Sequence, residues 1–142
     1  MLLIALLFLT GCLTNQTNQN MQTKEITINN VVIKIEIATT LEDQKQGLSD
    51  RESLNIDAGL LFVYDNYEVR NFWMKDMNFP LDILWIKDSS IVGFEQNIPI
   101  FNSQGQVNRI GSKVPVNRVL ELNSGYIRKN GFKVGDQVEG LD

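Results

Sequence analysis

The side chains best suited to bind a ligand gather in one stretch of this chain. Residues 71–83 have the sequence NFWMKDMNFPLDI, in which aromatic, charged and apolar residues are interleaved. On a strand, Trp73 and Lys75 would face one side, and Phe72 and Met74 the other. Trp73 beside polar groups is typical of a sugar-contacting surface, and equally of an ordinary half-buried tryptophan.

Asp82 is a carboxylate in an apolar setting. It would share one face of a strand with Leu84 and Ile86, so its side chain should be partly desolvated. A buried charge needs a partner, because the lost hydration has to be offset. Lys75 and Arg51 are the candidate partners.

Glu121 raises the same question, since it would share a face with Val119. Two interpretations stay open. In the functional one, Trp73, Lys75, Asp82 and Glu121 line a single cleft, with Trp73 as a stacking platform. In the structural one, the two carboxylates are solvated or fix loops through hydrogen bonds to backbone N–H groups.

Missing residue types limit the chemistry. The chain has no histidine, and its one cysteine is Cys12. This excludes Ser-His-Asp and Cys-His catalysis, as well as zinc, copper or haem sites built from histidine and cysteine. The sequence has no glycine-rich phosphate loop. We therefore expect no metal and no cofactor, while an enzymatic activity based on carboxylates stays open.

The first twelve residues predict the cellular location of the protein. Leu2 to Leu9 is an uninterrupted apolar run, and Leu9-Thr10-Gly11-Cys12 resembles a bacterial lipobox. The run is too short to cross a bilayer, which takes about 20 residues. We expect residues 1–11 to be a lipoprotein signal peptide that is cleaved before Cys12. The Cys12 thiol would then carry lipid, palmitate among the acyl chains.

The next segment predicts a tether. Residues 13–23, LTNQTNQNMQT, are uncharged and nearly free of apolar side chains. Such a segment buries too little surface to offset its ordering entropy, so we expect disorder. Residues 12–23 would hold the protein about 18 Å from its lipid anchor. The expected location is the cell envelope, on the extracytoplasmic side of a membrane.

Residues 24–142 are long enough for one globular domain and too short for two. The net charge is −4, and the basic residues do not cluster. A nucleic-acid partner is therefore not expected.

The hydrophobic pattern predicts a β-rich domain. A hairpin joins 25–28 to 31–38 through Asn29-Asn30, a pair that tolerates positive φ. Thr39 and Glu42 fit a capping box that begins a helix ended by Gly47, and Ser49 to Glu52 repeats the box. Further strands are expected over 60–64, 69–74, 81–86, 91–95 and 119–122, with an irregular segment at 97–108, a helical turn at 125–131 and a closing strand after Gly135-Asp136.

Strands outnumber helices, and no βαβ alternation is present in this pattern. We expect a mostly β (α+β) fold, in which a mostly antiparallel sheet curls into a small barrel-like domain with one or two short helices.

Several motifs occur together in a recognisable order. They are Gly47-Leu48-Ser49-Asp50-Arg51, Gly59-Leu60-Leu61-Phe62-Val63-Tyr64, Phe72-Trp73-Met74-Lys75-Asp76-Met77, Pro80-Leu81-Asp82-Ile83 and Val119-Leu120-Glu121-Leu122. With this set the chain resembles the domain of unknown function family 192, also called uncharacterised protein family 0127. The resemblance implies a compact, mostly β barrel-like domain, often secreted or lipid-anchored, and it assigns no activity and no catalytic residue.

Three functions are consistent with these features. The leading hypothesis is a lipid-anchored binding module that holds a small molecule, a glycan or an envelope protein against Trp73, Lys75, Asp82 and Arg51. The second is a hydrolase of envelope glycans that uses a pair of carboxylates, such as Asp82 and Glu121. The third is a structural or assembly role, in which these motifs only build the core.

Overall fold

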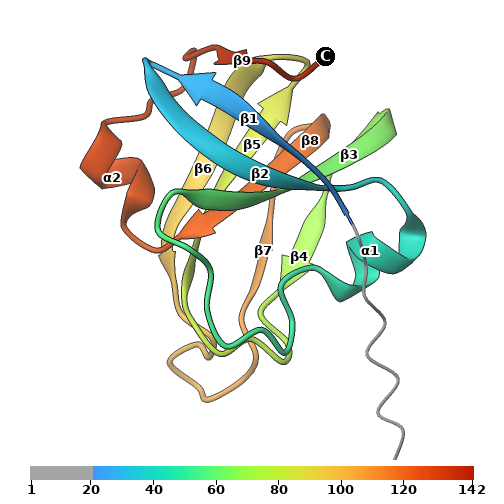
Figure 1. The fold of residues 1–142 in the computed structure, drawn as a ribbon. Coiled ribbons are helices and arrows are strands. Elements are labelled where there is room, and N and C mark those ends of the chain that lie inside the picture. Colours follow the sequence, from blue (N-terminus) through green and yellow to red (C-terminus); the bar gives the residue numbers. More distant parts are fainter. Residues whose placement is uncertain (1–20) are drawn as a thin grey trace, which may run out of the picture.

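The computed structural model describes residues 21–142, which form a curled, mostly β domain with two short helices (Figure 1). This confirms the predicted fold class. Among these residues, neither helix is long and apolar enough to span a bilayer. The elements are β1 (Gln22–Ile28), β2 (Val31–Ala38), α1 (Leu41–Gln46), β3 (Ala58–Glu68), β4 (Asn71–Trp73), β5 (Leu81–Lys87), β6 (Ser90–Ile98), β7 (Arg109–Gly111), β8 (Val116–Asn123), α2 (Tyr126–Asn130) and β9 (Val138–Glu139).

Seven strands form one sheet in the order β6-β5-β8-β3-β2-β1-β9. All neighbours are antiparallel except β2 and β3, which run parallel. The two edges of the sheet meet, because the Val138 N–H donates to the Ser89 carbonyl at 2.7 Å and the Ile91 N–H donates to the Asp136 carbonyl at 3.0 Å. The sheet is therefore curled into a half-barrel whose two edges are joined at one end. The strands β4 and β7 form a separate two-stranded ribbon.

The first hairpin follows the sequence prediction. Asn29 and Asn30 have φ of 50° and 65°, the backbone that a two-residue hairpin turn needs. β1 begins at Gln22, earlier than expected, and both Gln22 and Thr23 pair with β2. These two residues therefore belong to the domain and not to the tether predicted over 12–23. Met21, also in the predicted tether, packs against the apolar core, while the predicted signal peptide, Cys12 and residues 13–20 lie outside the described residues.

The helix caps are partly as predicted. The N-cap of α1 is Thr40, one residue after the predicted Thr39, and its hydroxyl accepts the Asp43 N–H at 3.1 Å. Gly47 ends this helix with a φ of 52°, as expected. Glycines also flank α2, since its N-cap is Gly125 and its C-cap is Gly131.

Two local predictions are wrong. Residues 49–52 form no helix, because the Ser49 hydroxyl donates to the Lys75 carbonyl at 3.0 Å instead of capping a following turn. The strand predicted over 69–74 is shorter and does not join the main sheet. As β4 it pairs with β7, a strand that the sequence pattern did not predict.

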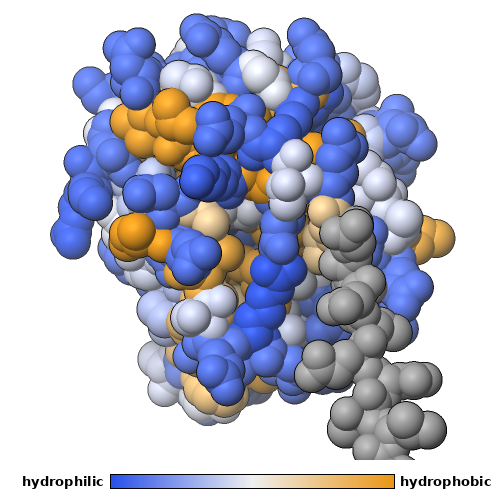
Figure 2. Space-filling view, in the orientation of Figure 1, coloured by the Kyte–Doolittle hydropathy of each residue, from blue (hydrophilic) through white to orange (hydrophobic). Residues whose placement is uncertain are grey.

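The central strands of the main sheet are buried on both faces, whereas β1 and β2 are buried on one. Alternate residues of these central strands belong to two separate apolar clusters, which is why Leu81 to Ile86 are all buried. One cluster includes residues of α2 and β9, and we call that side of the sheet the α2 face. The other cluster packs against Phe72 of β4, and we call that side the β4 face. Outside, hydrophilic side chains cover most of the surface seen in Figure 2, with smaller hydrophobic areas between them.

On the α2 face, Asp82 of β5 is hydrogen-bonded to both β6 and α2. The pairing of β5 with β6 shifts opposite this residue, which makes a bulge in β6. One oxygen of Asp82 accepts the Asn97 N–H of that bulge at 2.7 Å, and the other accepts the Ile127 N–H in the first turn of α2 at 2.9 Å. Its side chain is fully buried (0% exposed), and each of its two oxygens accepts a hydrogen bond.

We expect Asp82→Ala to lower the free energy of unfolding by about 3 kcal/mol, because two buried N–H groups would lose a charged acceptor. Urea denaturation measures this change. As a control, Glu42→Ala removes an exposed carboxylate from α1 and should cost less than about 0.5 kcal/mol. A loss below about 1 kcal/mol for Asp82→Ala would contradict this role.

Candidate functional site

The five candidate residues occupy three places in the fold. Trp73 and Lys75 lie together at β4, on the outside of the domain. Arg51 and Glu121 lie near each other on the β4 face of the main sheet, where the charge of Arg51 acts on Glu121. Asp82 lies on the α2 face. The residues that the functional interpretation placed in a single cleft therefore lie at three separate places.

The predicted partners of Asp82 are engaged elsewhere. Lys75 is 3.8 Å from the Asp76 carboxylate, and Arg51 pairs with Glu36 at 2.5 Å. Asp82 instead binds backbone N–H groups, which is the structural interpretation of this residue.

The two carboxylates do not form a pair. β5 and β8 are aligned so that Glu121 lies opposite Ile83, and Asp82 lies opposite Leu122. Because side chains alternate along a strand, Asp82 and Glu121 point to opposite faces of the sheet. A glycosidase needs both carboxyl groups on the same substrate, at about 5–10 Å from each other. This geometry does not provide such a pair.

Trp73 is the most exposed large aromatic residue of the motif. Its side chain is 50% exposed, whereas Phe72 and Met74 point inward to the core, as the alternation predicted. Arg109 lies opposite Trp73 in the β4–β7 ribbon, and its guanidinium carbon is 5.1 Å from the centre of a Trp73 ring. The Lys75 ammonium is 5.2 Å from the ring centre. Both distances suit cation–π contacts.

A surface depression of about 520 Å³ is formed at this ribbon. A second depression of about 420 Å³ shares Arg109 with it and extends along the loop before β7. We call these two depressions together the Trp73 surface. Its lining residues are Asn71, Phe72, Trp73, Asn102, Gln106, Val107, Asn108, Arg109, Ile110 and Gly111.

Arg109 was missing from the sequence-based candidates. It comes at the end of a segment expected to be irregular, and β7 has only three residues, too few for an alternating pattern. Its closeness to Trp73 depends on pairing across 36 residues of chain, which is the difference between the two positions. The basic residue itself was the only local signal.

Glu121 is buried, and one of its carboxyl oxygens has no hydrogen-bond partner. Its side chain is 6% exposed, and Oε2 has no hydrogen bond within the described residues. Leu60 and Ile83 lie opposite it on the neighbouring strands. Burial raises the pKa of Glu121 from its usual 4.5 to about 8, and the positive charge of Arg51 lowers it in part. Glu121 is therefore mostly neutral at pH 7.

Glu121 also influences its surroundings. Burial raises the pKa of the Tyr64 hydroxyl to about 12, an effect that the nearby Arg70 lowers and Glu121 increases. A buried titratable group with a shifted pKa next to a charged partner is a common mark of functional sites, although structural ion pairs shift pKa values as well. Residues 21–142 contain no group of three or more carboxylates placed to hold a metal ion.

These features define a class: a small, mostly β domain with a curled main sheet and a separate β4–β7 ribbon that carries an aromatic and basic surface depression. The chain belongs to the family DUF192, Uncharacterized ACR, whose sequence profile matches residues 24–140. This confirms the resemblance found in the motifs.

Two crystal structures share the fold. One, from Sinorhizobium meliloti and described as a candidate transcription regulator, has a TM-score of 0.76 and 28% identity, covering 84% of this chain and 94% of the other. The second, a protein of unknown function from Novosphingobium aromaticivorans, has a TM-score of 0.76 and 26% identity, covering 87% of this chain and 89% of the other. No curated protein shows a significant sequence match.

The pKa of Glu121 generates a stability prediction. Because the folded-state pKa of about 8 exceeds the usual 4.5, the stabilisation is complete below pH 4.5 and is lost as the pH rises to 8. We expect the free energy of unfolding to fall through this range by up to about 1.4 kcal/mol per pH unit, and Glu121→Gln to remove this fall.

Urea denaturation between pH 4 and 9 checks this. Glu139→Gln removes an exposed carboxyl of β9 and serves as the control, with the same pH dependence as the unmodified chain. If Glu121→Gln also leaves that dependence unchanged, Glu121 titrates normally and our account of its burial is incorrect.

Proposed function

We propose that this domain is a lipid-anchored binding module of the cell envelope, which holds an anionic glycan on the Trp73 surface. One observation carries the proposal. Trp73 is half exposed between the cations Arg109 and Lys75, beside a depression large enough for a sugar residue.

The exposed ring suits a sugar. Leaving a tryptophan ring in water is unfavourable, and an apolar ligand face that covers it gains about 25 cal/mol for each Å² removed from water. The C–H face of a pyranose ring provides such a surface, while its hydroxyl groups stay available to polar neighbours. Asn71, which also lines the depression, has an amide that can both donate and accept.

The charges beside Trp73 suit an anion. Arg109 forms no ion pair within the described residues, and Lys75 has only its distant, exposed contact with Asp76. A guanidinium binds a carboxylate or a phosphate through two parallel hydrogen bonds, and an ammonium adds a second positive charge. A ligand with acidic groups would therefore be preferred over a neutral one.

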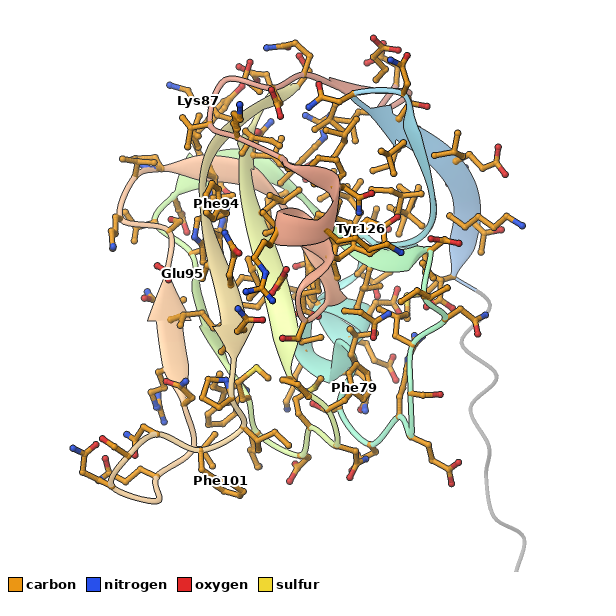
Figure 3. All side chains as sticks on the ribbon, turned by 90° about the vertical axis from the view of Figure 1, so that its left-hand side faces the viewer. Phe79, Lys87, Phe94, Glu95, Phe101 and Tyr126 are labelled. Atoms are coloured by element: carbon orange, nitrogen blue, oxygen red, sulfur yellow. The ribbon has the colours of Figure 1, made fainter. Side chains whose placement is uncertain are left out.

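The shape suits more than one sugar residue. The depression that shares Arg109 continues along the loop 99–108, where Asn102, Gln106 and Asn108 line it with amides. The exposed Phe101 lies on the same loop, at the end of the molecule opposite Lys87 (Figure 3). Amides that continue from the depression beside Trp73 fit an extended oligosaccharide.

The proposed anchor agrees with such a ligand. A lipid on Cys12 would hold the domain near the membrane, within reach of envelope polymers. Nine residues separate Cys12 from β1 in the sequence. This part of the proposal rests on the lipobox sequence.

Binding of oligosaccharides to the full chain tests the proposed ligand. We expect an oligouronate to bind at least about tenfold more tightly than a neutral oligohexose of the same length, because only the former can pair with Arg109 and Lys75. Trp73→Ala should weaken both ligands, and Arg109→Met should weaken only the acidic one. Isothermal titration calorimetry measures the four affinities.

Tyr67→Ala is the matched control, since Tyr67 is an exposed aromatic residue outside the Trp73 surface and should not affect binding. Equal binding by the Trp73→Ala variant and the unmodified chain would contradict the proposed site. Equal affinity for acidic and neutral ligands would contradict the role of the cations.

The anchor has its own test. We expect mass spectrometry of the protein from its native membrane to show a chain that begins at Cys12 and carries acyl groups. Cys12→Ser should move the protein from the membrane fraction to the soluble fraction. A native chain with an unmodified Cys12 thiol would overturn the proposed location.

A further inference from the structure

A second groove of about 360 Å³ lies on the β4 face, and it shares no lining residue with the Trp73 surface. Three of its lining residues are charged, namely Lys34, Glu36 and Arg51. The complete lining is Thr23, Lys34, Ile35, Glu36, Arg51, Ser53, Leu54, Asn55 and Ala58. The lining residues include two cations and one carboxylate, and Glu25 of β1 lies opposite Lys34 just outside the lining.

Arg51 pairs with one carboxyl group and acts electrostatically on a second. Its guanidinium pairs with Glu36 at 2.5 Å through one terminal nitrogen, Nη1. Glu36 lies opposite Leu60, and Leu60 lies opposite Glu121, so the two glutamates share a face two strands apart. Their backbones are therefore roughly 10 Å apart. The charge of Arg51 acts on Glu121, which places the guanidinium within electrostatic reach of both.

The wall of the groove is held in place by amide side chains. The Asn78 amide donates to the Arg51 carbonyl at 2.9 Å. The Asn123 amide, on the same strand as Glu121, donates to the Leu54 carbonyl at 3.1 Å and to the Asn55 carbonyl at 2.9 Å. The backbone that carries the groove residues is thus fixed to the sheet, and the groove is preformed in the absence of a ligand.

The buried carboxyl determines how much of the Arg51 charge is available. Arg51 from its loop, Glu36 from β2 and Tyr64 from β3 are the charged or titratable groups near Glu121, while the neighbouring residue of β5, Ile83, is apolar. When Glu121 is neutral, Arg51 is balanced by Glu36 alone. When Glu121 is ionised, a second carboxylate competes for the same guanidinium.

We propose that this groove binds a small oxyanion of the sulfate, phosphate or carboxylate class through Arg51 and Lys34, and that protonation of Glu121 keeps Arg51 available for it. Arg51 has five N–H donors, and the bond to Glu36 leaves others for a ligand. Glu121 acts through Arg51, so it is a positioning residue. The site is independent of the glycan surface proposed above.

Sulfate is the probe, because its charge does not change between pH 6.5 and 9. We expect sulfate added to the full chain at pH 6.5 to shift the Hα–Cα NMR signals of Ser53 and Asn55, which do not exchange with water and stay visible at pH 9. At pH 9 Glu121 is mostly ionised, given its pKa of about 8. The dissociation constant for sulfate should then be at least about tenfold larger, since the groove gains a negative charge.

Three variants separate the contributions. Arg51→Met should abolish the sulfate shifts at both pH values. Glu121→Gln is neutral at every pH, so it should bind sulfate equally at pH 6.5 and 9. Arg109→Met, which changes only the Trp73 surface, should leave the sulfate shifts at Ser53 and Asn55 intact.

Unchanged sulfate binding in Arg51→Met, or no shifts in the unmodified chain at pH 6.5, would overturn the site. The same pH dependence in Glu121→Gln as in the unmodified chain would overturn the role of Glu121. If Arg51→Met does not fold, Arg51→Lys replaces it. That variant keeps the charge without the planar fork, and full affinity with lysine would refute recognition by the guanidinium.

Discussion

Burial of the central strands of the main sheet on both faces is the constraint on which the rest of the structure depends. The central strands β3, β5 and β8 contribute alternate residues to two apolar clusters, so a polar group on these strands either finds partners or loses its charge. Asp82 has hydrogen-bond partners, because the bulge in β6 and the first turn of α2 provide N–H groups. Glu121 loses its charge, since its buried oxygen has no hydrogen-bond donor and its pKa is raised.

The same constraint places ligand binding outside the sheet. The aromatic and basic side chains that are free to meet a ligand lie on the β4–β7 ribbon, where Trp73 is exposed beside Arg109 and Lys75. The Asp82 part of the family motif serves stability and the Trp73 part serves recognition in our proposal. One continuous sequence motif can therefore contain residues with quite different roles.

The sequence predicted the β-rich fold, the Asn29-Asn30 hairpin and the placement of Trp73 on the side opposite Phe72 and Met74, because these depend on local alternation and turn chemistry. It could not distinguish Asp82 from Glu121, since both are single carboxylates in apolar strands. Their difference depends on whether free N–H groups lie opposite, which is a tertiary property. Arg109 was missed for a similar reason, because only the pairing of β4 with β7 brings it to Trp73.

The chain has two tryptophans, and they allow a direct test. Trp85 is 2% exposed in the core, whereas Trp73 is 50% exposed on the proposed surface, so their indole N–H signals provide an internal comparison in one NMR spectrum. The account predicts that an oligouronate shifts the Trp73 indole signal in a saturable manner and leaves the Trp85 signal in place. Saturable binding without any shift at Trp73 would contradict it.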